Sequence, residues 1–281
     1  MQRRPWDSTA YQVPLIGQGT WYLEEASHRA ALAALRRGLD LGMTHIDTAE
    51  MYGAGEAERI VGEAIAGRRE EAFLVSKVLP QNASRAGTRA ACERSLARLR
   101  TDRLDCYLLH WRGRYALEET VAGFDDLRRA GMILSWGVSN FDVEDLEELH
   151  TLAGGAQCAC NQVLYNLEER AVEHAVLPWC EQHRISVTAY SPFGHSRFPA
   201  PRSSRGRVLA QIAAAHGATP RQVALAFLTR RPTVLAIPKA SSIAHVEENA
   251  AAGDLLLSEV EVDSIDAAFP LGSRPVTLPT L

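Results

Sequence analysis

Two hydrophobic periods alternate along the chain. Short apolar runs with the composition of buried β-strands occur eight times, and segments with a helical apolar period lie between them. Several helical segments end at a glycine, the residue that most easily adopts the left-handed conformation found at helix ends. Strands that alternate with helices predict a parallel sheet. The strand-like runs cover residues 15–21, 43–47, 72–77, 104–111, 134–140, 158–166, 186–192 and 233–239.

The spacing of these runs is fairly regular. The chain advances 30 residues from Asp47 to Lys77 and 33 residues from Lys77 to His110. The last interval is longer because it holds a Ser-, Pro- and Arg-rich segment, residues 194–207, which we expect to be a loop. Eight βα units predict a (β/α)8 TIM barrel, α/β in class, with a single domain over residues 1–281. An open doubly wound sheet is the alternative, but no Gly-x-Gly-x-x-Gly motif follows the first strand.

Two segments lie outside the eight units. Residues 258–269 have a helical pattern and follow the last strand. The segment before the first strand is expected to cover the floor of the barrel.

Composition excludes several classes of protein. Hydrophobic residues make up 46% of the chain and charged residues 23%, as in a soluble globular protein. A formal net charge of −4 gives no basic excess for nucleic acid, and no apolar run reaches the ~18 residues of a membrane helix. No apolar stretch follows the two N-terminal arginines, so no signal peptide is predicted. Five scattered cysteines without ligand spacing predict core thiols in a reducing cytoplasm and no metal site.

Polar side chains recur at the ends of the predicted strands, where a barrel of this kind builds its active site. Of the 30 lysines and arginines only two are lysine, Lys77 and Lys239, and each directly follows an apolar run. Partly buried charges need partners, so this arrangement indicates a functional site. The strand-end residues are Asp47, Lys77, His110, Trp111, Ser139, Asn140, Gln162, Tyr190, Ser191 and Lys239, with Tyr52 in the loop after Asp47.

Four of these residues form a chemically coherent set. Tyr52 is ordinarily a poor acid, with a pKa of about 10, and a nearby ammonium favours its phenolate. Lys77 suits that role because its ammonium is a compact point charge, and Asp47 on the adjacent strand can hold it in place. His110, one strand further, can hydrogen-bond a carbonyl oxygen. The pattern predicts general-acid catalysis on a carbonyl compound, with Tyr52 as the proton donor.

Other interpretations of these residues remain open. Asp47 can cap the following helix, Lys77 can be a surface charge, and His110 can be a hydrogen-bonded rim histidine. A Schiff-base aldolase would also place a lysine at a strand end, but it does not need Tyr52. A metal-dependent hydrolase needs more histidines and carboxylates than Asp47 and His110 supply. A cofactor-binding subunit without turnover would not need all four residues.

Seven segments of the chain resemble the aldo-keto reductase superfamily, most closely its bacterial, diketogulonate-reductase-like members. They are HIDTAEMYGAGEAERIVGEAI, FLVSK, LDCYLLHW, WGVSNF, NQVLYN, VTAYSP and IPKASSIAHVEEN, in that order over essentially the whole chain. The resemblance implies a monomeric (β/α)8 enzyme that reduces aldehydes or ketones with a nicotinamide cofactor. By their places in these motifs, Asp47, Tyr52, Lys77 and His110 match the catalytic tetrad of the family.

The resemblance also implies a cofactor site at the strand ends. Some positions match residues that hydrogen-bond the nicotinamide carboxamide, one matches the aromatic residue that stacks on the nicotinamide ring, and two fall where the family contacts the pyrophosphate. These are Ser139, Asn140 and Gln162 for the carboxamide, Tyr190 for the ring, and Ser191 and Phe193 for the pyrophosphate.

Lys239 begins the segment that resembles the family's site for the adenosine phosphate. Members that favour NADPH usually have serine after this lysine and arginine six residues after it, where this chain has Ala240 and His245. Because a bidentate arginine is missing, we expect NADPH to be preferred less absolutely than usual and NADH to be accepted as well. The matched residues are Lys239, Ser241, Ser242 and His245 around the phosphate, and Glu248 and Asn249 at the adenine.

Aromatic residues are expected to line the substrate pocket. Trp21 follows the first strand and Trp111 follows His110, and an aromatic wall suits apolar or flat carbonyl compounds. Only twelve residues follow Phe269, so we expect the C-terminal loop that narrows specificity in many family members to be reduced. This favours an open site and broad tolerance for small carbonyl substrates. The segment 194–207 is either a plain surface loop or a cover over the phosphates of the cofactor.

Overall fold

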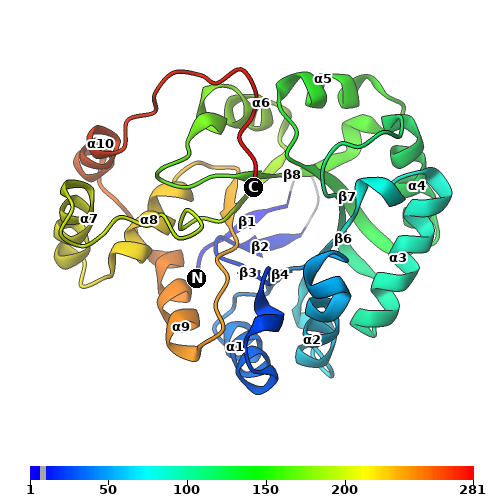
Figure 1. Cartoon of the computed structure of the whole chain (residues 1–281), viewed down its shortest axis with the longest axis horizontal. Helices are drawn as coiled ribbons and strands as arrows, with labels where there is room; N and C mark the ends of the chain where they lie inside the picture. The colour runs from blue at the N-terminus through cyan, green and yellow to red at the C-terminus, as the bar shows by residue number, and fades with distance from the viewer. Residues whose placement is uncertain (7–10) are drawn as a thin grey trace.

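An eight-stranded parallel sheet curls around the centre of the molecule (Figure 1). The computed structural model of the chain describes residues 1–6 and 11–281. In the sheet, each strand pairs with the strand that precedes it and the strand that follows it in the sequence. The strands are β3 (Gln18–Gly19), β4 (His45–Asp47), β5 (Phe73–Val78), β6 (Leu104–Leu109), β7 (Ile133–Ser139), β8 (Cys158–Leu164), β9 (Ser186–Tyr190) and β10 (Val234–Ala236).

The first and last strands meet and close the sheet. Parallel bridges join Ile16 to Ala236 and Gly19 to Lys239. A side chain at Gly19 would place its Cβ 2.5 Å from the carbonyl oxygen of Ile237, so this close approach requires glycine. The fold is therefore the predicted (β/α)8 barrel. The predicted first strand was too long, because only Gln18–Gly19 form a regular ladder within residues 15–21.

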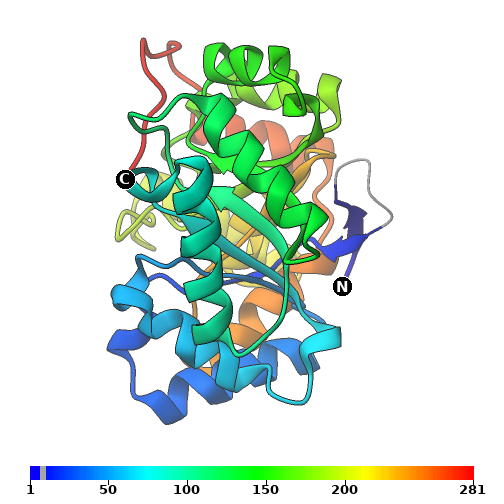
Figure 2. The same cartoon turned by 90° about the vertical axis from the view of Figure 1, so that its right-hand side faces the viewer.

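Helices surround the barrel on its outside (Figures 1 and 2). In α1, buried Ala31, Ala34, Leu35 and Leu39 recur every three or four residues, which turns one face toward the sheet. Within the described residues, no helix is long and apolar enough to span a membrane. The helices are α1 (His28–Asp40), α2 (Glu56–Ala64), α3 (Arg85–Leu99), α4 (Leu117–Arg129), α5 (Val143–Thr151), α6 (Val176–His183), α7 (Ser204–Ala215), α8 (Pro220–Leu228), α9 (Ile243–Ala251) and α10 (Glu259–Ala268).

Local capping sets several helix starts. The side chain of Ser203 accepts a hydrogen bond from the backbone of Gly206 and so caps α7. The loop predicted over residues 194–207 therefore ends four residues earlier than expected. Ser258 forms a reciprocal capping box with Glu261 at the start of α10, which confirms the helix predicted at 258–269.

A β-hairpin covers the N-terminal end of the barrel, as expected. Strands β1 (Arg3–Pro5) and β2 (Gln12–Pro14) pair in antiparallel fashion, and the connecting residues 7–10 lie outside the described part of the chain. Trp6 is fully buried, with its ring centroid 5.5 Å from that of His45 and 4.8 Å from that of Phe73. His45 and Phe73 begin β4 and β5, so Trp6 lies at the floor. Figure 2 shows the hairpin and the C-terminus on opposite sides of the barrel.

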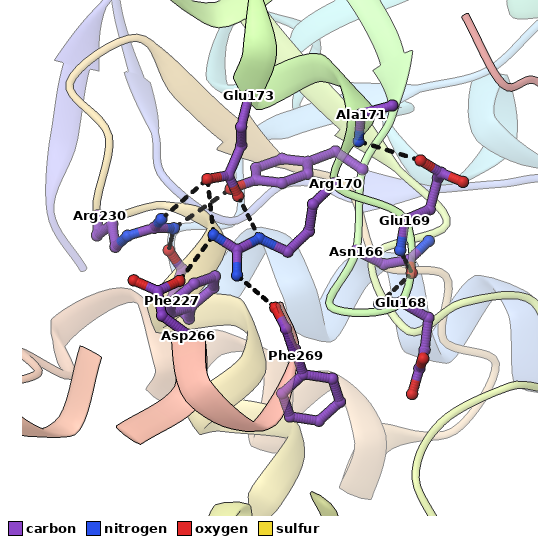
Figure 3. Close-up of polar contacts among 11 residues, drawn as sticks. Asn166, Glu168, Glu169, Arg170, Ala171, Glu173, Phe227, Arg230, Asp266 and Phe269 are labelled. Atoms are coloured by element: carbon purple, nitrogen blue, oxygen red, sulfur yellow. Dashed lines mark hydrogen bonds and ion pairs between the residues drawn. The ribbon is translucent and has the colours of Figure 1, made fainter. Parts of the chain in front are cut away.

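A buried ion-pair network fixes the end of α10 to the segment after β8 (Figure 3). Arg170 donates to both carboxylate oxygens of Glu173, at 2.7 and 2.8 Å, and to the carbonyl oxygen of Phe269 at 2.7 Å. Its guanidinium also lies 2.7 Å from Asp266. Arg230 lies 3.3 Å from the same Glu173. Beyond Phe269, residues 270–281 run around the rim of the barrel to its centre (red in Figure 1).

Candidate active site

The predicted catalytic residues meet at the C-terminal ends of β4 and β5. The Nζ of Lys77 lies 2.5 Å from Oδ1 of Asp47, 2.9 Å from the carbonyl oxygen of Thr48 and 3.1 Å from the hydroxyl of Tyr52. Lys77 is fully buried and Asp47 is 1% exposed. Lys77 is therefore no surface charge. The Asp47 carboxylate binds side chains across the barrel and does not act as a helix cap.

The loop that carries Tyr52 has an unusual backbone. Gly53, Ala54 and Gly55 all have positive φ, at 53°, 51° and 91°. Ala54 adopts this conformation at a steric cost that glycine avoids. The three left-handed residues reverse the chain immediately after Tyr52, so that α2 can begin at Glu56.

Two acidic residues that the sequence analysis missed hold this loop. Glu50 accepts hydrogen bonds from the backbone of Leu79 at 2.8 Å and from Asn82 at 2.9 Å. Glu58 is fully buried and accepts from Ser76 at 2.6 Å, while Arg98 lies 2.5 Å from its other oxygen. The sequence could have pointed to these two glutamates, because both lie within a few residues of Tyr52 in the segment that follows Asp47.

Burial and charge act in opposite directions on the tyrosine. Burial raises the pKa of Tyr52 above its ordinary value, the Lys77 ammonium lowers it, and the Asp47 carboxylate raises it again. The Lys77 ammonium thus lowers the pKa of Tyr52 as predicted, but burial outweighs it and the net shift is upward. Burial disfavours the charge on Lys77, but Asp47 and Tyr52 outweigh it and raise the pKa of the ammonium. Lys77 is therefore charged and Tyr52 protonated at neutral pH.

His110 is an uncharged neighbour of Tyr52. Their ring centroids are 5.8 Å apart, and the rings meet edge to face. Burial, with a contribution from the Lys77 ammonium, lowers the pKa of His110 to about 2. Its Nδ1 is buried and has no hydrogen-bond partner among the described residues.

A small cavity opens beside Tyr52 and His110. Its volume is about 60 Å³. The two predicted tryptophans line it, and so does the far end of the C-terminal segment, where the backbone N–H of Leu281 donates to the hydroxyl of Tyr190 at 3.3 Å. The short segment after Phe269 thus reaches the pocket, which the expectation of a reduced loop did not foresee. The lining is Trp21, Met51, Tyr52, His110, Trp111, Ser139, Asn140, Gln162, Tyr190 and Leu281.

A larger groove of about 320 Å³ leads from Asp47 and Tyr52 to Lys239. Its two sides are the loop after β3 and the loop after β9, and they touch where the rings of Trp21 and His195 stack, with centroids 5.3 Å apart. Lys239 is exposed at the end of the groove. The remaining lining is Gly19, Thr20, Trp21, Tyr22, Tyr190, Ser191, Pro192, Phe193, His195, Ser196 and Ile237.

Only part of the predicted cofactor site therefore lies along the groove. Tyr190, Ser191, Phe193 and Lys239 line it. The other predicted contacts to the adenosine end occupy the turn before α9 and α9 itself, and among the described residues they are not part of the groove lining. Ser242 caps α9 by accepting from the backbone of His245. Glu248 accepts a 2.6 Å hydrogen bond from Thr219, and Asn249 is buried. Of the predicted cofactor residues, Ser139, Asn140 and Gln162 line the small cavity, and those in neither lining are Ser241, Ser242, His245, Glu248 and Asn249.

The three residues predicted to bind the carboxamide are already connected to the rest of the site. Ser139 donates to the carbonyl oxygen of Gln162 at 2.8 Å. Asn140 donates to the carbonyl oxygen of His110 at 3.2 Å and accepts from the hydroxyl of Tyr190 at 2.9 Å. Gln162 donates to Oδ2 of Asp47 at 2.7 Å. The carboxamide residues and the tetrad are therefore one network.

Comparison with known proteins identifies the family. The model of the aldo/keto reductase family matches residues 15–269. This chain belongs to that family. As an aldo/keto reductase it is an oxidoreductase. It is 51% identical over 260 residues to methylglyoxal reductase YeaE of Escherichia coli, covering 92% of each chain. It is 32% identical to glyoxal reductase of Bacillus subtilis, over 91% of this chain and 89% of that protein.

Solved structures of the family agree with this assignment. An aldo/keto reductase from Klebsiella pneumoniae, in complex with NADP and acetate, superposes with a TM-score of 0.94. The two sequences are 46% identical, and the match covers 100% of both chains. A second structure of an aldo-keto reductase from Klebsiella pneumoniae, in complex with NADPH, gives the same TM-score of 0.94.

The site of this aldo/keto reductase disfavours the competing chemistry. A Schiff-base lysine must be an uncharged amine, whereas the pKa of Lys77 is raised and its ammonium is bonded to three oxygens. Among the described residues, no group of three or more His, Cys, Asp or Glu side chains is arranged to hold a metal ion.

Proposed function

We propose that this protein reduces small aldehydes and ketones to alcohols with NADPH, and that Tyr52 donates the proton. The observation that carries this proposal is the position of the Lys77 ammonium, 2.5 Å from Asp47 and 3.1 Å from the Tyr52 hydroxyl. A buried tyrosine beside a clamped ammonium is a proton donor whose conjugate base is stabilised as it forms.

Each side chain of the tetrad has a separate task. Tyr52 hydrogen-bonds the carbonyl oxygen of the substrate and transfers its proton when that oxygen becomes an alkoxide. Lys77 stabilises the phenolate that remains, and Asp47 keeps the ammonium charged and in place. His110, which is neutral, orients the carbonyl oxygen by a hydrogen bond. Preorganised groups of this kind stabilise the developing charge without reorganisation at the moment of reaction.

The groove has the features that a nicotinamide cofactor needs. One end lies at Tyr52 and Asp47, the side chain of Tyr190 offers a flat surface there, and the other end carries the cation Lys239. NADPH, when bound, supplies the hydride. Lys239 would bind the 2′-phosphate of NADPH, because its ammonium is exposed and has no acidic partner among the described residues. The NADP and NADPH complexes of the Klebsiella enzymes support this choice of cofactor.

The substrate cavity favours small compounds. Its volume is about 60 Å³, against about 320 Å³ for the groove, and its lining combines aromatic and aliphatic side chains with polar ones. Two of the relatives of this protein are a methylglyoxal reductase and a glyoxal reductase. We therefore place small dicarbonyls first among its substrates, with tolerance for other small aldehydes. The monomeric state, the cytoplasmic location and the single domain over residues 1–281 stay predictions.

NADPH consumption over a panel of aldehydes, ketones and dicarbonyls tests the proposal, with Tyr52→Phe as the control. We expect turnover on small dicarbonyls and a loss of about 10²-fold or more in the variant. No turnover on the whole panel, or full activity without the hydroxyl, would refute it. Lys239→Ala should lower the preference for NADPH over NADH, and a kcat/KM for NADH at or above that for NADPH in the parent enzyme would refute the role of Lys239.

A further inference from the structure

Gln162 connects two opposite sides of the barrel. It lies on β8, 115 residues from Asp47 on β4, yet its Nε2 is 2.7 Å from Oδ2 of that carboxylate. The other oxygen, Oδ1, accepts from Lys77 at 2.5 Å. Gln162 and Asp47 are 2% and 1% exposed, so the bond between them lies in the interior of the barrel. Each oxygen of one buried carboxylate thus has its own donor, from a different strand.

We propose that Gln162 is a positioning residue of the reaction, which holds the Asp47 carboxylate in the orientation that directs one oxygen at Lys77. This inference rests on the proposed function. A carboxylate only accepts hydrogen bonds, so the amide nitrogen of Gln162 must face it and the amide oxygen must face away. Two charge-assisted hydrogen bonds, one to each oxygen, fix the rotation of the carboxylate about its Cβ–Cγ bond.

The contact reaches Tyr52 through charge. The titratable groups around Asp47 are Lys77, Tyr52, His45 and Cys160. The carboxylate raises the pKa of Tyr52, and Lys77 lowers it. A hydrogen bond from Gln162 withdraws negative charge from the carboxylate, so it moderates the effect of Asp47 on the tyrosine. Loss of that bond should move the pKa of Tyr52 further up.

The same geometry leaves the oxygen of the Gln162 amide available to the cofactor. It is an acceptor, so it suits the NH2 group of a carboxamide, the partner that the family resemblance gives this residue. One side chain would then touch both the cofactor and the tetrad carboxylate. Binding of the carboxamide would restrain the amide, and through it the carboxylate.

Gln162→Met tests the inference, because methionine keeps the length of the side chain without donor or acceptor. The matched control is Gln18→Met: Gln18 is also a buried glutamine on a barrel strand, but its amide donates to the carbonyl oxygens of Leu35 and Met43. We measure kcat at saturating NADPH from pH 6 to 11, and the Kd of NADPH by fluorescence. At Gln162→Met we expect kcat to fall about tenfold or more and its alkaline decline to move to higher pH. Gln18→Met should change neither.

Gln162→Glu provides a second, independent signature. A glutamate there carries a donor only when protonated, so its turnover should rise as the pH falls, whereas that of the parent enzyme stays level. If Gln162→Met keeps the parent kcat and pH profile and only the Kd of NADPH rises, Gln162 serves the cofactor alone and the inference is wrong.

A readout without turnover separates this inference from the proposed reaction. The side-chain amide of Gln162 is observable by 1H–15N NMR in the protein without cofactor and is assigned through its loss in Gln162→Met. We expect the signal to exchange slowly with solvent and to shift in Asp47→Asn. If the amide signal of Gln162 is unchanged in Asp47→Asn, the inference is wrong, whether or not the parent enzyme is active. Inactivity of the parent enzyme would instead refute the reductase function.

Discussion

The ammonium of Lys77 lies 3.1 Å from the hydroxyl of Tyr52 and 4.9 Å from the centre of its ring. Three oxygens surround this nitrogen, from Asp47, Thr48 and Tyr52. A compact tetrahedral cation fits such a cage, whereas a planar guanidinium needs a wider one. The use of lysine here, in a chain that otherwise uses arginine almost throughout, thus has a geometric reason.

Lys77→Arg is therefore expected to abolish turnover while NADPH still binds. The guanidinium would displace either the carboxylate or the tyrosine, and the proton donor would lose its support. The measurement is kcat together with the Kd of NADPH from fluorescence. Lys239→Arg is the comparison, because Lys239 is exposed at the other end of the groove and an arginine can also bind a phosphate. Equal losses of turnover in the two variants would contradict separate roles for the two lysines.

The reduction rate should be level through neutral pH. The pKa of Tyr52 is raised by burial, so the tyrosine stays protonated and able to donate up to and beyond its ordinary value of about 10. His110 stays neutral because its pKa is about 2, so it adds no decline between pH 5 and 7. A kcat profile at saturating NADPH checks this. A decline in kcat between pH 7 and 9 would show that the bound state makes Tyr52 much more acidic.

The proximity of the candidate catalytic residues could be predicted from the sequence, because a barrel brings its strand ends to one face. Asp47, Lys77 and His110 end successive strands, so their proximity follows from the fold. The opposing effects on Tyr52 could not be predicted, because desolvation depends on packing from several loops at once. The contact of Leu281 with Tyr190 is likewise a property of the path of the chain over the rim, which no local pattern encodes.

The bond between Gln162 and Asp47 shows a second limit. The sequence placed both residues at strand ends, but on strands that are not neighbours. A barrel closes the distance between such strands through its interior, and which pairs meet there depends on register and strand tilt. The family resemblance implies that Gln162 hydrogen-bonds the cofactor, and it does not imply a hydrogen bond from Gln162 to Asp47.

His45 should make the protein lose stability in acid. Its ring is fully buried against Trp6 and Phe73, and neither nitrogen has a hydrogen-bond partner among the described residues. Burial lowers its pKa to about 4, from an ordinary 6.5. Between these values the unfolded chain binds a proton that the folded protein excludes. Stability is therefore lost as the pH falls from 6.5 to 4, by an amount on the order of 3 kcal/mol.

His45→Leu removes this proton uptake and should reduce the dependence, while His110, whose pKa burial also lowers, keeps its own share of it. Urea unfolding at several pH values between 7 and 4 measures the slope. His150→Leu is the control, since His150 is exposed on α5 and its replacement should leave the slope unchanged. If His45→Leu keeps the slope of the parent protein, other groups cause the acid sensitivity.

The stack of Trp21 on His195 should slow the release of the cofactor. The two rings come from opposite sides of the groove and lie nearly parallel, at an interplanar angle of 15°. Both rings line the groove, so we expect their contact to hinder the departure of a molecule bound there. Removing the indole in Trp21→Ala should raise the dissociation rate of NADPH about 3- to 10-fold, as expected for loss of roughly 0.5–1.5 kcal/mol of aromatic stacking. Stopped-flow displacement of NADPH measures this rate. His195→Ala should behave alike, and an unchanged rate in both variants would show that the stack does not close the groove.

The guanidinium of Arg170 donates to the carboxylate of Glu173 and to the carbonyl oxygen of Phe269 (Figure 3). Arg170 and Glu173 are 6% and 9% exposed, and Arg170→Met would leave the buried carboxylate with the Tyr165 hydroxyl at 2.6 Å and the Arg230 guanidinium at 3.3 Å. Removing one partner of a buried ion pair costs about 3–5 kcal/mol, so a large loss of unfolding free energy is expected. Arg205→Met is the matched control: Arg205 holds the adjacent carbonyl oxygen of Ala268 at 3.0 Å but is 44% exposed, so its loss should cost less than about 1 kcal/mol.

Arg170→Met should also affect the pocket, because Arg170 holds the carbonyl oxygen of Phe269, from which the chain leads to Leu281 in the cavity lining, where it bonds Tyr190. Without this bond, residues 270–281 lose the contact that fixes their start, and the part of the cavity wall that they form should become more mobile. KM for small dicarbonyls should therefore rise by a larger factor than kcat falls. The double variant Arg170→Met, Glu173→Met should recover much of the stability, since no buried carboxylate is left without its partner. It should not recover KM, because the bond to Phe269 is still missing. Recovery of both would show that the network acts on the pocket only through overall stability.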